Sequence, residues 1–186
     1  MYVRRMFGLS LLSLGLACGC SGPPRTTRMT LQDYTEISGE MAAKLGNSQF
    51  LAERTTSSPR MVIAIRKIEN LSSDMIPAGA QWYMQTRVVE SVPMTEWSRD
   101  KNIAFTIPAD RLREARRYGE VNEAFATQRK PTHVMTAIIR SITRTADKDR
   151  TDLYYCEYQI TDLASGGIVW ADKVEFKRLA EGIAWD

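Results

Sequence analysis

The 186-residue sequence has few of the side chains from which most enzyme and metal sites are built. It contains a single histidine, His133, and only three cysteines. Most zinc sites and most nucleophile–base pairs need more imidazole and thiolate groups than this, and no G-x-S-x-G sequence is present. We therefore expect no catalytic residue, no metal site, no cofactor and no small-molecule substrate.

The sequence also has little net charge. Lys and Arg together number 25 and Asp and Glu 22, which gives a formal charge of +3 at pH 7. Arg4 and Arg5 lie in a segment that we expect to be removed, and without them the counts are 23 and 22. A protein that binds nucleic acid through bulk charge needs a basic stripe that neutralises phosphates. We expect no nucleic-acid partner.

Residues 1–19 have the pattern of a signal peptide. Arg4 and Arg5 provide a basic start, an apolar run of about twelve residues extends from Met6 to Ala17, and small residues follow. A membrane-spanning helix needs about 20 apolar residues. The run is therefore predicted to be an export signal rather than a transmembrane helix.

The end of this segment resembles a bacterial lipobox, in which a cysteine after small residues receives a diacylglyceryl group. Cys20 is the predicted lipidation site because Gly19 precedes it and Ala17 stands at the third position back. Cys18 is an alternative, although Gly15 stands at its third position back. The remaining alternative is an ordinary secreted protein. Each buried acyl methylene contributes roughly 0.8 kcal/mol, so several acyl chains would anchor the protein firmly.

Three parts are predicted along the chain: the signal peptide, a lipidated cysteine with a short linker over residues 20–30, and a single domain over residues 31–186. The linker Ser21–Thr30 is polar and contains two adjacent prolines, and it spans at most about 35 Å when extended. If Cys20 is acylated, its sulfur becomes a thioether and Cys156 is the only thiol left, which excludes an internal disulfide in the mature chain.

The first half of the domain combines helical and strand patterns. A helix begins after Thr30; its apolar residues recur at helical spacing, and Asp33, Glu36, Glu40 and Lys44 fall on the opposite, solvent side. The unbroken apolar run Met61–Ile65 predicts a strand that is covered on both faces. We further expect a helix over 78–92 with Trp82 on its inner side, a strand over 102–107 and a helix from Asp110 to about Ala126.

The last third of the sequence predicts three consecutive strands, over residues 134–145, 153–161 and 168–177. In the middle strand, Tyr154, Cys156, Tyr158 and Ile160 alternate with more polar neighbours, which is typical of an antiparallel sheet with one buried face. The predicted fold class is α/β, with a mixed sheet that has early βαβ units and a C-terminal antiparallel meander, and with helices packed against it.

Several of these segments resemble the LpoB-type lipoprotein activators of class A penicillin-binding proteins. The matching sequences are the lipobox, LQDYTEISGEMAAKL, RMVIAIRKIENLSSD and LYYCEYQITDLASGGIVWADKVEF, which together with the order of elements cover about three quarters of the chain. The piece ITDLASGGIVWADKVEF is the most specific, and it also occurs in the related CsgG and TolB N-terminal-like domains.

The resemblance implies a lipoprotein of the cell envelope that faces the periplasm, with the outer membrane favoured over the inner one. It further implies that the protein is not an enzyme but binds a peptidoglycan synthase and stimulates its activities. Well-known members carry a long Pro-rich arm where this chain has a linker of about ten residues. An alternative function is a CsgG-like subunit of an outer-membrane secretion assembly. Such a subunit needs additional amphipathic strands, and every strong strand here is already needed by the domain.

Two groups of residues are candidates for contact with a protein partner. Arg113, Arg116 and Arg117 lie on the predicted outer face of one helix, where clustered arginines suit an acidic surface. Trp97 and Trp185 lie in less regular polar segments, so each is a candidate for an exposed interface anchor, whereas Trp170 is expected to be buried in its strand. The alternative is that the arginines form an ordinary charged helix face.

Overall fold

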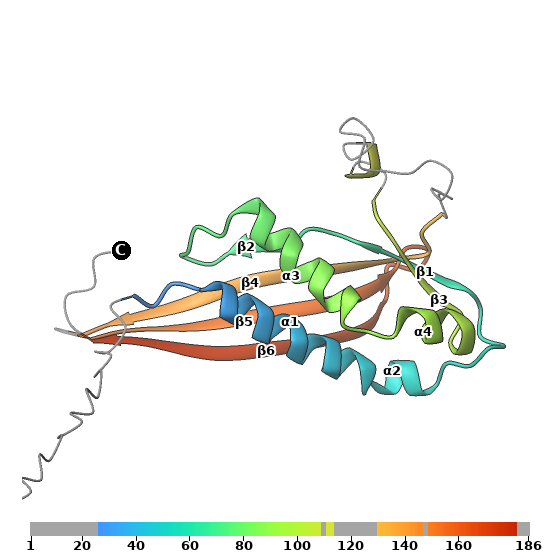
Figure 1. The fold of residues 1–186 in the computed structure, drawn as a ribbon, viewed down its shortest axis with the longest axis horizontal. Coiled ribbons are helices and arrows are strands. Elements are labelled where there is room, and N and C mark those ends of the chain that lie inside the picture. The colour runs from blue at the N-terminus through green and yellow to red at the C-terminus, as the bar shows by residue number, and fades with distance from the viewer. Residues whose placement is uncertain (1–25, 109–110, 114–129, 147–148, 182–186) are drawn as a thin grey trace, which may run out of the picture.

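The computed structural model describes residues 26–108, 111–113, 130–146 and 149–181, and Figure 1 shows their arrangement. The helices are α1 (Leu31–Gly46), α2 (Gln49–Ala52), α3 (Ala78–Glu90) and α4 (Met94–Asp100). The strands are β1 (Met61–Ile65), β2 (Glu69–Leu71), β3 (Ile103–Thr106), β4 (His133–Thr145), β5 (Asp149–Asp162) and β6 (Ile168–Glu181).

All these strands belong to one mixed sheet with the order β3-β1-β4-β5-β6, and β2 pairs with β4 further along the edge that β1 occupies. β1 is parallel to both β3 and β4, whereas β5 is antiparallel to β4 and β6. The helix α3 connects the parallel strands β1 and β3. The predicted α/β class is therefore confirmed, with its βαβ unit and its C-terminal meander.

The meander β4-β5-β6 forms the long axis of the molecule (Figure 1). Its strands are 13 to 14 residues long, and each buries alternate side chains on the face that we call the inner face. On β5 these are Tyr154, Cys156, Tyr158 and Ile160, all at most 1% exposed. The intervening side chains form the outer face. The alternation predicted from sequence is confirmed along the whole strand.

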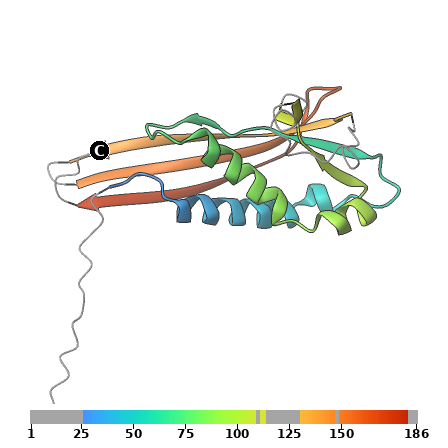
Figure 2. The same ribbon diagram turned by 45° about the horizontal axis from the view of Figure 1, so that its top comes forward.

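The helices α1 and α3 pack along each other and both lie on the inner side of the sheet (Figure 2). Their apolar stripes meet Met135, Ile139 and the inner face of β5 in one hydrophobic core. The helical period correctly predicts the burial of Tyr34, Ile37, Met41, Ala42 and Leu45. Leu31, expected on the same side, is 66% exposed, and Asp33 and Ser38 are buried in addition. Lys44 joins α1 to the sheet because its ammonium lies 3.1 Å from Asp172 and donates to the Lys173 carbonyl.

Some expectations from sequence are corrected. Trp82 is only partly buried, because α3 turns Gln81, Met84, Gln85, Val88 and Val89 to the core instead, and the Arg111 guanidinium lies 5.6 Å from the Trp82 ring. The short elements α2, α4 and β2 were not expected. The helix expected over 110–126 lies outside the described residues except for a helical stretch at 111–113. Within the described residues, no helix is long and apolar enough to span a bilayer.

Candidate functional site

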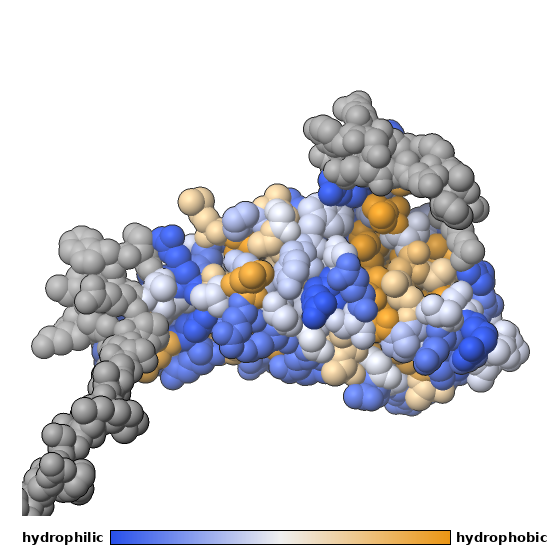
Figure 3. Space-filling model, in the orientation of Figure 1, coloured by the Kyte–Doolittle hydropathy of each residue, from blue (hydrophilic) through white to orange (hydrophobic). Residues whose placement is uncertain are grey.

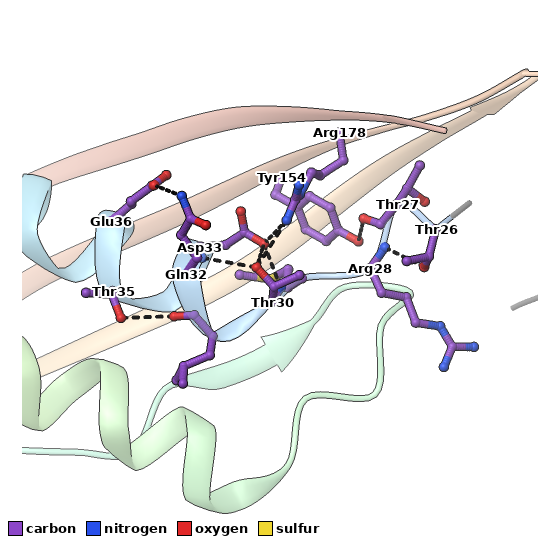
Figure 4. A network of polar contacts seen from close by, with 12 residues as sticks. Thr26, Thr27, Arg28, Thr30, Gln32, Asp33, Thr35, Glu36, Tyr154 and Arg178 are labelled. Atoms are coloured by element: carbon purple, nitrogen blue, oxygen red, sulfur yellow. Dashed lines mark hydrogen bonds and ion pairs between the residues drawn. The ribbon is translucent and has the colours of Figure 1, made fainter. Parts of the chain in front are cut away.

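The N-terminal segment Thr26–Met29, which we call the N-terminal strap, is held against the inner face at the end of the meander near the β4–β5 turn (Figure 4). The Thr27 hydroxyl donates to the carboxylate of Asp152. The Met29 backbone N–H donates to Asp74 Oδ2 at 2.8 Å. Thr27 and Met29 are 0% and 9% exposed. Residues 26–29 were included in the predicted linker, and in the structure they pack against the sheet.

Tyr154 connects the strap to the rest of the fold. Its hydroxyl donates to Asp74 Oδ2 at 2.8 Å and lies 3.2 Å from the carbonyl oxygen of Thr27. The ring is fully buried and stacks on Phe176 with 5.0 Å between ring centroids. One side chain of β5 therefore holds the strap, the β2–α3 loop and β6 together.

Burial and hydrogen bonding set the charge state of this network. Burial raises the pKa of Tyr154 and the hydrogen bond to Asp74 raises it further, so the hydroxyl stays protonated and keeps its role as a donor. Burial acts to raise the pKa of Asp152 as well, but hydrogen bonds from Thr143 and Thr27 and the nearby Arg150 outweigh it and hold the pKa below its ordinary value. Asp152 is therefore an ionised, fully buried carboxylate.

The start of α1 continues the network towards β6. Thr30 and Asp33 form a capping box, in which the Asp33 carboxylate accepts from the Thr30 backbone N–H. Arg178 of β6 donates to the same carboxylate and lies 3.1 Å from the Thr30 hydroxyl. Asp33 was expected on the solvent side of the helix. It is buried because its carboxylate serves both as the helix cap and as the partner of Arg178.

The single histidine has no catalytic arrangement. His133 Nδ1 lies 2.8 Å from the Thr132 hydroxyl and Nε2 lies 3.5 Å from Asp162. This looks like a nucleophile–base–acid set, but the Thr132 hydroxyl also accepts from the Val62 backbone N–H at 3.0 Å. The contacts therefore join β1, β4 and the β5–β6 turn, and they position no nucleophile in a pocket.

The other groups that could support chemistry are the Cys156 thiol and clusters of metal-ligating side chains. Burial raises the pKa of the Cys156 thiol to about 12, and the side chain is fully buried, so it is not a reactive thiolate. Within the described residues no group of three His, Cys, Asp or Glu side chains is placed to hold a metal ion.

The predicted partner-contact residues have different outcomes. Trp97 is 8% exposed, so the expectation of an exposed anchor is wrong. The segment Met94–Asp100 is helical and turns this ring onto Phe105, with 6.3 Å between ring centroids. Trp170 is 7% exposed and its predicted burial is confirmed. Arg113 is exposed. Arg116, Arg117, Trp185 and the lipidation candidates Cys18 and Cys20 lie outside the described residues.

Shallow hollows mark the helix-covered side. Trp97 lines two adjoining hollows of about 350 and 180 Å³, which run between α1 and α4 and also contain Gly46 and Asn47. In the space-filling view of this side, hydrophobic residues gather where α3, α4 and β3 meet (Figure 3). Met94 and Ile107, at 44% and 47% exposure, belong to this region of the chain. These surfaces are suited to contact with another protein.

The outer face of the meander is a second open surface. The helices α1 and α3 are both on the inner side (Figure 2), so in the described part of the chain no helix covers β4, β5 and β6 from outside. A hollow of about 440 Å³ on this part of the sheet is lined by residues that include Thr136, Ile138, Gln159 and Lys173. The Thr136 hydroxyl is buried and has no hydrogen-bond partner among the residues that the structure describes.

Comparison with known proteins places the chain in a family. The sequence model described as "Peptidoglycan-synthase activator LpoB" matches residues 33–176, from the start of α1 to β6. The chain belongs to the LpoB family. The resemblance seen in the sequence is thereby confirmed, and LpoB proteins are activators of peptidoglycan synthases. No curated protein matches the chain in sequence.

Three solved structures illustrate the likeness. The LpoB C-terminal domain from Escherichia coli is 11% identical, with 77% of this chain and 98% of that chain covered and a TM-score of 0.44. The LpoB C-terminal domain from Salmonella enterica is 9% identical with the same coverages and a TM-score of 0.43. Lipoprotein GNA1162 from Neisseria meningitidis is 14% identical, covering 63% and 83%, with a TM-score of 0.38. At these scores the structures carry no argument about function.

Replacement of Tyr154 by Phe should release the strap. The change removes one of the two hydrogen bonds that Asp74 Oδ2 accepts, the other coming from the Met29 backbone N–H. Loss of a hydrogen-bond partner by a buried charged group costs about 1–3 kcal/mol of unfolding free energy. Denaturant unfolding should show this loss, and hydrogen exchange should become faster at the amides of residues 27–29. Tyr155→Phe is the matched control on the outer face of the same strand and should change stability by less than about 0.5 kcal/mol. Equal effects of the two variants would contradict this role of Tyr154.

The only histidine should make stability depend on pH. Burial lowers the pKa of His133 below 6.5; the nearby Asp162 opposes this shift and Arg54 adds to it. The unfolded chain therefore takes up a proton first, and the free energy of unfolding should fall as pH drops below 6.5. Thermal unfolding of the wild type should show this fall and His133→Gln should show less of it. The same slope in both proteins between about pH 7 and pH 5.5 would exclude His133 as the cause.

Proposed function

We propose that the protein is a membrane-anchored lipoprotein of the cell envelope that binds a class A penicillin-binding protein and activates it, without being an enzyme itself. The observation that carries the proposal is the match to the LpoB family over residues 33–176. The lack of a catalytic or metal-binding arrangement in the described residues agrees with a regulatory role. The predicted lipobox at Cys20 supports the anchor, with the outer membrane as the expected location.

Activation requires only differential binding. A protein that binds the active conformation of a synthase more tightly than the inactive one raises the active population. A rigid docking domain is suited to this role because little of its binding energy is spent on its own ordering. Here the long meander and the two helices packed on it provide such a body, and the open surfaces described above provide room for a partner.

The decisive experiment is a polymerisation assay with the class A penicillin-binding protein of the same organism. Addition of the purified full chain should raise the rates of glycan polymerisation and of peptide crosslinking several-fold, and the chain alone should produce neither product. Mass spectrometry of the mature N-terminus should find diacylglyceryl on Cys20. Unchanged synthase rates over a range of protein concentrations would contradict the proposed function.

The arginine cluster gives a prediction about the docking surface. Replacement of Arg113, Arg116 and Arg117 by Glu should weaken binding to the synthase, because reversed charge opposes an acidic partner surface. The circular dichroism spectrum should stay unchanged, since Arg113 is exposed. A pull-down with the synthase measures the binding, and retention equal to that of the wild type would remove these arginines from the interface.

A further inference from the structure

The outer face of the meander has two halves that differ in how their charges are satisfied. In the half towards the β5–β6 turn, Arg140 pairs with Glu157 and Lys173 pairs with Glu175. In the half towards the β4–β5 turn, Arg144 and Lys177 are exposed. Neither of these two cations forms an ion pair within residues 26–108, 111–113, 130–146 and 149–181.

The register of the sheet surrounds these two cations with aliphatic side chains. One row across the outer face is Arg144, Thr151 and Leu179, and the next is Ile142, Leu153 and Lys177. Neighbours in such rows are about 5 Å apart. We call the side chains Leu71, Ile142, Arg144, Leu153, Lys177 and Leu179 the basic–aliphatic patch.

Three of the aliphatic side chains in the patch are about half exposed to solvent. Ile142 is 51% exposed and Leu179 is 47% exposed. Leu71 of β2, at 53%, faces the same side because it pairs with Arg140. Asp149 lies in the next row towards the β4–β5 turn, so the positively charged region ends at this row. It forms an ion pair with neither Arg144 nor Lys177. Aliphatic groups interleaved with unpaired cations are typical of surfaces that meet the boundary of a lipid bilayer.

The N-terminal strap lies on the inner face of the sheet, directly opposite this patch, and the chain leaves the domain there. Thr27 is bonded to Asp152, and Asp152 stands on β5 between the patch-row residues Thr151 and Leu153, pointing to the inner face. The chain therefore departs towards its N-terminus at this end of the molecule (Figures 1 and 4). Thr26 is six positions from Cys20, which is roughly 20 Å of extended chain.

We propose that the basic–aliphatic patch binds an anionic phospholipid surface, so that the anchored domain lies with this end of its outer face on the membrane. This inference rests on the proposed function for the anchor at Cys20. Arg144 and Lys177 bind the phosphate groups, and Ile142, Leu153 and Leu179 enter the boundary between headgroups and acyl chains. A second copy of the chain fits less well, because a two-fold contact would set the same unpaired cations against one another.

The test measures contact with lipid at a labelled position. The full chain is reconstituted in vesicles of phosphatidylcholine, with or without phosphatidylglycerol, and carries a fluorophore at Thr151→Cys. The natural Cys156 is buried and stays unlabelled. Nitroxide-labelled lipids should quench this fluorophore several-fold more strongly when phosphatidylglycerol is present. A fluorophore at Gln159→Cys, on the same face of the same strand but in the other half, should be quenched little in either vesicle.

Charge variants identify the cause. Arg144→Gln with Lys177→Gln should reduce the ratio of docked to undocked protein about thirty-fold and abolish the extra quenching. The matched control is Arg87→Gln with Lys130→Gln, which removes two exposed cations outside the patch and should leave the quenching unchanged. Equal quenching at residues 151 and 159, or quenching that survives the Arg144 and Lys177 changes, would overturn the proposal.

Two further outcomes separate this inference from the proposed function. If the chain does not float with phosphatidylcholine vesicles, the anchor is absent. The patch alone should then still bind the chain to vesicles that contain phosphatidylglycerol. Absence of binding to these vesicles would overturn the proposed lipid-binding role of the patch. Stimulation of the synthase in detergent, where no bilayer exists, should be unaffected by the Arg144 and Lys177 variant. Loss of stimulation under these conditions would show that the patch contacts the synthase and not the lipid.

Discussion

The alternation of side chains along β5 is the constraint on which the rest of the structure depends. This strand lies between β4 and β6, and its fully buried inner residues require a cover of similar length. The helices α1 and α3 provide that cover, because their apolar stripes pack against the strands and against each other. The same alternation leaves the outer face with polar and aliphatic side chains that the described helices do not cover. Because successive side chains of a strand point to opposite faces, the sheet has one face that the helices cover and one face that they leave open.

Polar contacts at one end of this closed face determine how the domain is attached to the rest of the chain. Tyr154 belongs to the alternating pattern, yet its hydroxyl reaches Asp74 and the strap rather than ending in the apolar core. The Thr27 hydroxyl and the Met29 backbone N–H of the strap both have acceptors in this network, so a pull on the N-terminus acts on the end of the meander. If Cys20 is the anchor that we propose, the short predicted linker makes the position of the domain relative to the membrane depend on this end of the sheet.

His133, Thr132 and Asp162 have the residue types of a catalytic set, but their contacts are used to join strands. Membership of the LpoB family agrees with a domain that acts by binding. In our proposals the two faces have different functions. The outer face near the strap binds lipid. The hollows near Trp97 and the arginines of the predicted helix remain available to bind the synthase.

Much of the architecture could be predicted from sequence because hydrophobic periodicity is a local property. The positions of α1, α3 and the three meander strands follow from residues spaced by two or by three to four positions, and that of β1 follows from an unbroken apolar run. The elements that were missed, α2, α4 and β2, are too short to show a period. The exposure predicted for Trp97 was wrong for the same reason, because the sequence of a seven-residue helix between polar segments does not show which side is buried.

The sequence by itself determined the α/β class, the buried face of the meander, the family and the scarcity of catalytic groups. Only the tertiary structure decided that the strap packs against the sheet, that Asp33 is buried and that two cations of the outer face lack acidic partners among the described residues. The physical reason is distance along the chain. Thr27 and Asp152 are 125 positions apart in the sequence, and Asp33 and Arg178 are 145 positions apart. A local sequence pattern does not show which polar side chains come into contact once the sheet has formed.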